Sequence, residues 1–249
     1  MGQELAGIRA LLSTPTYGPV DPDAQKSLRV AMMTAANHGL YWAGDASPDR
    51  MTYGYARNKT AQTLFDYPDL ADGIMWVDSD IMLEPMSITR LIDAAVHNHI
   101  DFATGIYHKR AGNFEPLIYH FDPKSEKFYI IPEYPENTLM IVGGCGFGFV
   151  WTSKACLTKM SQHPSFDPKR GWFPDERDTG GFGEDLNFCY KAIKSGVDLY
   201  VDTGVQVGHL GDPVAYGRSH YLQAYEKIKE RALVQTPPET WGTPAGTIE

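Results

Sequence analysis

Cysteine is scarce in this chain, and long apolar runs are missing. The three cysteines, Cys145, Cys156 and Cys189, lie far apart and form no CxxC pair. We therefore expect neither a disulfide framework nor a cysteine-ligated zinc site, and we expect a reducing, cytoplasmic compartment. No stretch approaches the roughly 18 consecutive apolar residues of a membrane span, and no signal-peptide pattern is present, so we expect no membrane-spanning segment.

Excess positive charge is also lacking. The 22 Lys and Arg residues are outnumbered by 31 Asp and Glu residues, which gives a formal net charge of -9. Nucleic acid and anionic membranes attract basic surfaces, so nucleic acid is not an expected partner, although a modified base as an acceptor stays open. A small anionic ligand is compatible with this charge when a divalent cation supplies local positive charge.

The length of 249 residues fits one domain with a substantial core. The first hundred residues alternate strand and helix patterns, which predicts an α/β fold with a mostly parallel central sheet. The predicted strands are 8–13, 40–43 and 74–77, and the predicted helices are 23–36, with Asp23 as its cap, and 55–65.

The second half of the chain begins with strand patterns that have no helices between them, which predicts a smaller antiparallel or mixed sheet. The predicted strands are 102–107, 117–121, 127–131, 138–142 and 199–207, and the predicted helices are 153–161, 184–194 and 215–233. We expect the single domain to span residues 1–234 and the segment 235–249 to be a poorly ordered tail.

The strongest local signal is an apolar strand that ends in Asp78-Ser79-Asp80. Ligands of open parallel sheets collect at the carboxyl ends of the strands. Two carboxylates on such a turn can bind a hard divalent ion, which in turn holds phosphate groups. The alternative is an ordinary solvated turn, because Asp and Ser favour turns.

Two later motifs also carry candidate chemistry. Glu184 and Asp185 follow a glycine-rich loop and open a helix, where acids either complement the helix dipole or include a general base. His209 lies between glycines after a strand, and it is either a metal ligand or a structural histidine. Lys109 and Arg110 follow another strand and either add positive charge to a site or are solvated.

The order of the motifs is more specific than any one of them. The chain has PTYG after the first strand, GDAS after the second and ARN on a helix. WVDSD, GGCGFGF, GED and a late GH follow in that order. This series resembles the GT-A fold glycosyltransferases, especially the family-2-like group, over about residues 11–209. The resemblance departs at PTYG, where the family has PTYN, and the QxxRW motif of processive synthases is absent.

The resemblance implies a Rossmann-like GT-A domain with a nucleotide-binding half at about 5–107 and an acceptor half at about 108–234. It implies that the nucleoside and diphosphate of a nucleotide-sugar, by family habit a UDP-sugar, are bound by the N-terminal motifs. The residues implied are Pro15, Thr16, Tyr17, Asp45, Arg57, Asp78 and Ser79.

The resemblance also implies a divalent cation, Mn²⁺ or Mg²⁺, held by Asp80 with His209 and Asp78. Asp185 would be the general base for an acceptor hydroxyl, with Glu184 beside it. The donor sugar or acceptor would contact Gly143, Gly144, Trp151 and Trp172, although each tryptophan fits the core equally well.

The expected function is therefore transfer of a sugar from a nucleotide-sugar to an acceptor hydroxyl. A nucleotide-sugar hydrolase and a non-catalytic nucleotide- or glycan-binding module are the alternatives. A sugar nucleotidyltransferase is disfavoured, because the GxGxRL-type loop is missing after the first strand. The sequence leaves the donor, the acceptor, inversion or retention, and the oligomeric state open.

Overall fold

The computed structural model describes residues 5–225, apart from positions 17, 19, 49, 176–180, 212–213, 220 and 223–224. The expected tail at 235–249 lies outside the described residues, as does most of the last predicted helix. In the described part of the chain, no helix has the length and apolar character needed to cross a membrane.

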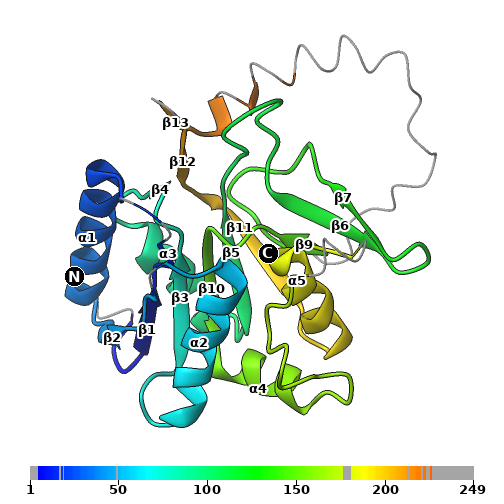
Figure 1. Ribbon diagram of the computed structural model, residues 1–249. Coiled ribbons are helices and arrows are strands. Elements are labelled where there is room, and N and C mark those ends of the chain that lie inside the picture. The colour runs from blue at the N-terminus through cyan, green and yellow to red at the C-terminus, as the bar shows by residue number, and fades with distance from the viewer. Residues whose placement is uncertain are drawn as a thin grey trace.

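A seven-stranded sheet forms the centre of the molecule (Figure 1), in the order β2-β1-β3-β10-β5-β11-β8. Five strands (β2, β1, β3, β5 and β11) run in one direction, and β10 and β8 run opposite to them. This confirms the α/β fold with a mostly parallel central sheet. The strands are β1 Arg9–Ser13, β2 Tyr41–Asp45, β3 Gly73–Val77, β5 Phe102–Ile106, β8 Leu139–Val142, β10 Phe149–Ser153 and β11 Leu199–Gln206.

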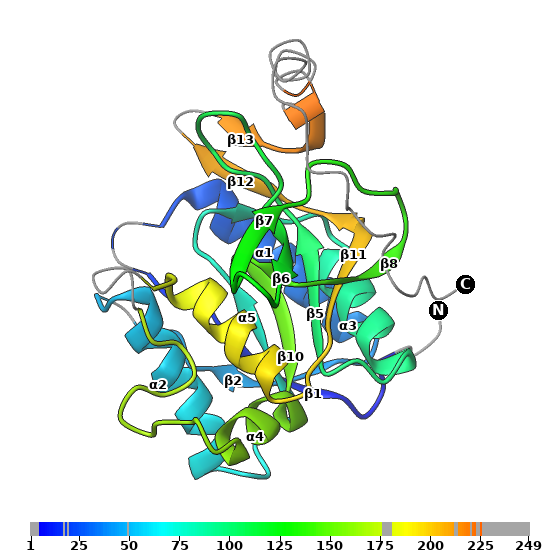
Figure 2. The same cartoon turned by 90° about the vertical axis from the view of Figure 1, so that its right-hand side faces the viewer.

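Within the described residues, five helices with assigned bounds cover the two faces of this sheet (Figure 2). They are α1 Pro22–Asn37, α2 Tyr53–Asp66, α3 Ser87–His97, α4 Lys154–Gln162 and α5 Glu184–Lys194. Helices α1 and α3 share one core cluster with Met75 and Val77 of β3, and α2, α4 and α5 share the other with Ile74 and Trp76. Alternate residues of β3 therefore enter opposite cores, as expected for a central strand buried on both faces.

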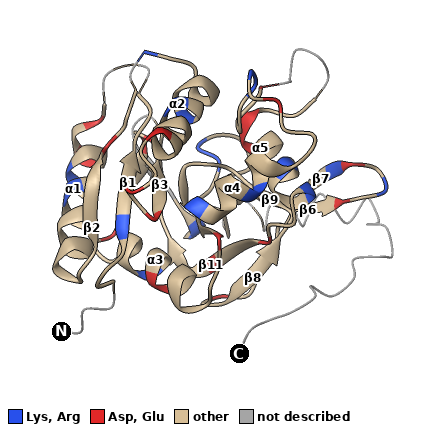
Figure 3. Ribbon diagram, turned by 90° about the horizontal axis from the view of Figure 1, so that it is seen from below, with Lys and Arg blue, Asp and Glu red and all other residues tan. Residues whose placement is uncertain are grey.

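Two small sheets complete the fold. One consists of β13 Val214–Tyr216, β12 Gly208–Gly211 and β4 Ile81–Met82, and the other of β7 Lys127–Ile130, β6 Ile118–Asp122 and β9 Gly144–Cys145. Both are antiparallel, which confirms the smaller antiparallel sheet expected in the second half. Figure 3 shows acidic and basic positions interspersed on the β6–β7 hairpin, where Glu126 accepts a hydrogen bond from Tyr190 of α5 at 2.9 Å.

Two local predictions were wrong, and one helix and one strand of the central sheet were not predicted. The cap of α1 is Asp21 and not Asp23, because Asp21 Oδ1 accepts the backbone N–H groups of Asp23 and Ala24 at 2.8 and 3.1 Å. Residues 215 and 216, predicted to begin a helix, belong to β13, because they pair with β12. Helix α3 and strand β10 were missed, although Ile88, Leu91, Ile92 and Ala95 have the spacing of a buried helix face.

Candidate functional site

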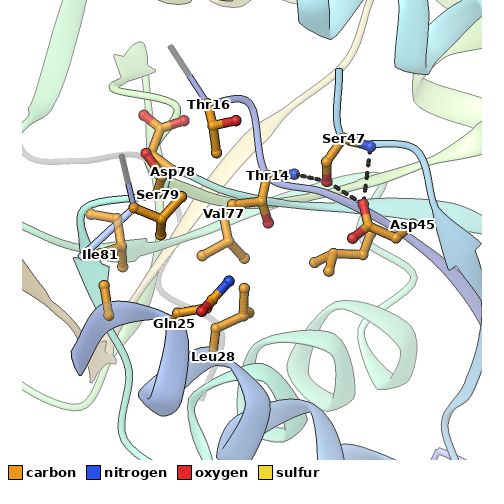
Figure 4. A pocket seen from close by; sticks show the side chains of 13 residues that line it. Thr14, Thr16, Gln25, Leu28, Asp45, Ser47, Val77, Asp78, Ser79 and Ile81 are labelled. Carbon is orange, nitrogen blue, oxygen red and sulfur yellow. Dashed lines mark hydrogen bonds between the residues drawn. The ribbon is translucent and has the colours of Figure 1, made fainter. Parts of the chain in front are cut away.

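A cavity of about 160 Å³ lies at the carboxyl ends of β1, β2 and β3 (Figure 4). Its lining residues are Leu12, Thr14, Thr16, Val20, Ala24, Gln25, Leu28, Asp45, Ser47, Val77, Asp78, Ser79 and Ile81. Four predicted nucleotide-binding residues, Thr16, Asp45, Asp78 and Ser79, are therefore brought together at one edge of the sheet. Pro15 is buried beside Thr16, and Tyr17 lies outside the described residues.

The β2 side of the cavity is ordered by a turn. Asp45 Oδ1 accepts the backbone N–H of Ser47 at 2.9 Å and the Ser47 hydroxyl, while Ser47 Oγ accepts the backbone N–H of Thr14 at 2.7 Å. The Thr14 hydroxyl is buried and has no hydrogen-bond partner among the described residues. The polar residue of this wall that a ligand can reach is Asp45, which is exposed.

The opposite wall contains Asp78, whose carboxylate contacts the guanidinium of Arg57. Arg57 Nη2 donates to Asp78 Oδ1 at 2.8 Å and to Oδ2 at 3.1 Å. Burial raises the pKa of Asp78 to about 6, even though the charge of Arg57 acts in the opposite direction. Asp78 is thus a carboxylate whose ionisation depends on a single buried cation.

Asp185 is held by the same guanidinium. Arg57 Nη1 lies 2.5 Å from Asp185 Oδ1 and 3.7 Å from Glu184 Oε1, and the backbone N–H of Phe147 donates to Asp185 Oδ2 at 3.2 Å. The Asp185 side chain is still 31% exposed, so the carboxylate reaches solvent while both of its oxygens are oriented. This geometry is suited to a general base.

Arg57 lies behind Asp78, which lines the cavity. Its side chain is 1% exposed, and its charged nitrogens face the carboxylates of α5 and β3 instead of an open site for a base or diphosphate. The rings of Tyr53, Phe147 and Phe173 lie 5.2 to 5.9 Å from its guanidinium carbon. The expected nucleotide contact of Arg57 stays a prediction, and in this structure its side chain is buried against carboxylates.

Asp80 and His209 come together because β4 and β12 pair. His209 lies opposite Ile81 in this pairing, and its Nε2 is 3.3 Å from Asp80 Oδ2. His209 Nδ1 lies 2.8 Å from the carbonyl oxygen of His108, and only a protonated Nδ1 can donate to that oxygen. The Nε2 atom therefore faces a carboxylate, an arrangement that is stable only with a proton or another cation between the two atoms.

Arg110 also contacts Asp80. Arg110 Nη1 donates to Asp80 Oδ2 at 2.6 Å, and its side chain is 57% exposed. Burial alone would raise the pKa of Asp80, but the hydrogen bond and charge of His209 and the charge of Arg110 hold it below the ordinary value. Lys109 instead pairs with Glu115 at 2.7 Å. In the described part of the chain, no group of three or more His, Cys, Asp or Glu side chains could hold a metal ion. Asp80 and His209 are a pair of possible ligands.

The predicted sugar-binding residues have structural roles. Trp151 and Trp172 are 3% and 4% exposed and lie in the two core clusters, so the structure favours the core alternative and leaves no open ring face for a sugar. A Cβ on Gly143 would lie 2.1 Å from the backbone nitrogen of Phe121, and one on Gly144 would lie 2.8 Å from the Phe128 ring. Close strand packing thus requires both glycines, whatever they contact in a complex.

Three polar lining residues, Thr14, Gln25 and Ser47, were not singled out as site residues from the sequence. Ser47 follows Asp45 by two residues, which is the spacing of an Asx turn, so this signal was present. Gln25 is on the first turns of α1, and its carboxamide points into the cavity in Figure 4. Its position depends on how α1 packs on the sheet, which no local pattern gives.

Comparisons with known proteins bear on the fold. No protein-family model and no curated protein matches the chain. The crystal structure of A197 from STIV is similar over 86% of this chain and 92% of its own length, with 17% identity and a TM-score of 0.59. The crystal structure of GalNAc-T7 with UDP, GalNAc and Mn2+ is similar over 89% of this chain, with 11% identity and a TM-score of 0.50. This chain covers 48% of GalNAc-T7, or about half of its length.

A third structure, CMP:2-keto-3-deoxy-manno-octonic acid synthetase complexed with CTP, is similar over 90% of this chain and 99% of its own, with 13% identity. The TM-score of this match is 0.49. Taken with the sheet order and helical layers, the likenesses to A197 and GalNAc-T7 show that the chain has a Rossmann-like α/β fold of the GT-A type.

Proposed function

We propose that the chain is a metal-dependent glycosyltransferase that moves a sugar from a nucleotide-sugar to an acceptor hydroxyl. The observation that carries the proposal is the β4–β12 pairing. It sets His209 Nε2 3.3 Å from Asp80 Oδ2, directly beside a cavity lined by Ser79 and Ile81. A carboxylate and an imidazole that could both ligate a divalent cation, next to a cavity that includes Asp45, Asp78 and Ser79 in its lining, support a nucleotide-sugar as the donor.

The nucleoside end of the donor would occupy the cavity. Asp45 would take its polar groups, because this exposed residue lies on the β1–β2 wall. Asp78 and Ser79 would contact the ribose or diphosphate. The GalNAc-T7 structure was solved with UDP and Mn2+, and the same classes of ligand, a uridine nucleotide and a divalent cation, are proposed for this chain.

The diphosphate would lie against Asp80 and His209. When bound there, Mn²⁺ or Mg²⁺ would stabilise the negative charge that develops on the leaving diphosphate. With two protein ligands, the remaining coordination positions suit phosphate oxygens and water. Arg110 is exposed enough to leave Asp80 and contact a phosphate in the same place.

Asp185 would act as the general base. The acceptor hydroxyl oxygen attacks the anomeric carbon, its proton passes to the Asp185 carboxylate, and the bond between that carbon and the diphosphate oxygen breaks. The carboxylate is oriented for this step by Arg57 and by the Phe147 N–H. If water replaced the acceptor, the same residues would hydrolyse the donor, so a nucleotide-sugar hydrolase is the second candidate.

The proposal is tested by incubating the protein with UDP-, GDP- and other nucleotide-sugars in the presence of Mn²⁺ or EDTA. We expect one donor to release its nucleotide with Mn²⁺, and we expect EDTA or Asp80→Ala to abolish the release. Mass spectrometry of acceptors then distinguishes transfer from hydrolysis. Calorimetry that detects no binding of any nucleotide-sugar, with or without Mn²⁺, would refute the proposal, and binding without turnover in every acceptor screen would identify a non-catalytic module.

A further inference from the structure

Arg57 and Asn58, in the ARN segment of α2, bind protein groups on neighbouring elements. Arg57 is fully enclosed, and its two terminal nitrogens divide between different elements: Nη2 contacts Asp78 at the end of β3, and Nη1 contacts Asp185 at the start of α5. The next residue, Asn58, accepts the backbone N–H groups of Trp172 and Phe173 at 2.8 and 3.0 Å. One turn of helix thus joins three segments that are far apart in the sequence.

The charges around Arg57 explain why this arrangement needs an arginine. Three carboxylates, those of Asp78, Glu184 and Asp185, lie within 3.7 Å of its guanidinium. Without the cation they would repel one another in a partly desolvated site. The planar guanidinium contacts two carboxylates at once through a fixed fork, which a lysine ammonium cannot reproduce. The aromatic rings of Phe147 and Phe173 further restrict where the guanidinium can lie.

We infer that Arg57 is a positioning residue that sets the general base Asp185 in a fixed relation to Asp78 on the donor side of the site, without touching the donor. The inference rests on the proposed function, and it goes beyond it by assigning the link between the donor-binding and acceptor-activating halves. Asp78 and Asp185 are bound to the same guanidinium. A displacement of one carboxylate therefore shifts Arg57, and with it the other carboxylate.

The test compares Arg57→Lys, Arg57→Met, Asp185→Asn and the double variant Arg57→Lys/Asp185→Asn. Donor affinity is measured by calorimetry and turnover by nucleotide release. We expect Arg57→Lys to change the donor Kd less than about threefold and to lower kcat about 100-fold, since small misplacement of a reacting group has an effect of that order. The combined loss of kcat in the double variant should be at least tenfold smaller than the product of the two single losses, because both changes act on one unit.

Arg9→Lys is the matched control. Arg9 Nη2 pairs with Asp72 Oδ1 at 3.0 Å at the start of β1, and the cavity lies at the other end of this strand. The substitution therefore changes an Arg–Asp pair outside the site. We expect its kcat to equal that of the wild type. A rise of more than tenfold in the donor Kd of Arg57→Lys, with kcat unchanged, would overturn the inference and make Arg57 a donor ligand. Fully multiplicative losses in the double variant would also overturn it.

A readout without turnover separates the two proposals. The unfolding equilibrium constant of each variant is measured with urea. The effect of the double variant should differ from the product of the two single effects by at least about tenfold, because the two side chains are in direct contact. Additive effects would refute the contact even in an active enzyme. A wild-type chain that shows this coupling but releases no nucleotide would instead refute the proposed function, and with it the base role of Asp185. Arg57→Lys keeps the buried charge, so the test stays open if Arg57→Met does not fold.

Discussion

His209 Nε2 lies 3.3 Å from Asp80 Oδ2, and the link between them is the two-residue pairing of β4 with β12. The backbone N–H of Leu210 also donates to the carbonyl of Asp80 at 2.8 Å, so backbone and side chains make the same connection. The imidazole is oriented from behind by the carbonyl of His108. A short strand pair therefore sets the geometry of the proposed cation site.

Asp80→Asn and His209→Ala should each weaken Mn²⁺ binding at least about tenfold, because each removes one of two proposed protein ligands. Electron paramagnetic resonance of free Mn²⁺ measures the affinity directly, without turnover. The control is His97→Ala, since His97 pairs with Asp93 at 2.9 Å on the exposed face of α3. Equal Mn²⁺ affinity in all three variants and the wild type would remove the Asp80–His209 pair as the cation site.

Asp45→Ala should raise the Kd of the nucleotide-sugar about tenfold or more, because a hydrogen bond to a charged acceptor contributes roughly 1.5 to 3 kcal/mol. The kcat at saturating donor should change little. Asp122→Ala is the control, because Asp122 also orders a turn, accepting the backbone N–H of Lys124 at 3.0 Å, but lies on the β6–β7 hairpin. Similar losses of affinity in both variants would show that turn stability, and not a base contact, explains the effect.

The stability of the wild type should depend on the ionisation of Asp78. The pKa of this carboxyl is raised by burial from 3.8 to about 6, so the folded state binds the proton more tightly than the unfolded state. The contribution of Asp78 to the free energy of unfolding therefore falls as the pH rises from about 4 to about 6 and is constant above that range. Its full size is about 3 kcal/mol at 1.36 kcal/mol per pKa unit.

The measurement is urea unfolding of the wild type and Asp78→Asn between pH 4 and pH 8. As the pH rises from about 4 to about 6, the free energy of unfolding of the wild type should fall relative to that of Asp78→Asn. The asparagine amide does not titrate, so the variant lacks this contribution. A difference between the two proteins that stays constant from pH 4 to pH 8 would show that Asp78 ionises at its ordinary pKa. The comparison subtracts the titration of carboxyl groups that the two proteins share.

Trp172→Phe should lower the free energy of unfolding by about 1 to 3 kcal/mol and leave the donor KM within about twofold. The substitution removes core volume and the hydrogen bond from the indole N–H to the carbonyl of Leu157, at 3.0 Å. Trp42→Phe is the control, because its indole N–H donates to the carbonyl of Met32 at 3.1 Å in the other core. A tenfold change of KM in Trp172→Phe alone would restore the ring as a sugar platform.

Much of the fold could be predicted because its signals are local. The predicted boundaries of the strand before Asp78 and of the helix after Gly183 lie within one residue of β3 and α5, because apolar periodicity and capping signals depend on neighbours in the sequence. The position of β10 could not be predicted. All five of its residues pair antiparallel with β3 and three of them with β5, and this pairing depends on partners that are distant in the sequence.

The sequence by itself determined the α/β class, the strand ends that carry Asp45 and Asp78, and the order of the candidate motifs. The tertiary structure alone decided which of those side chains meet. Arg57 looked like a donor ligand on an exposed helix start, but the packing of α2 against α5 buries it between two carboxylates. Trp151 and Trp172 were equally suited to core or surface until the sheet and its helices enclosed them. Burial and long-range pairing are properties of the whole chain, because each is set by contacts among segments whose separation along the sequence carries no information about their separation in space.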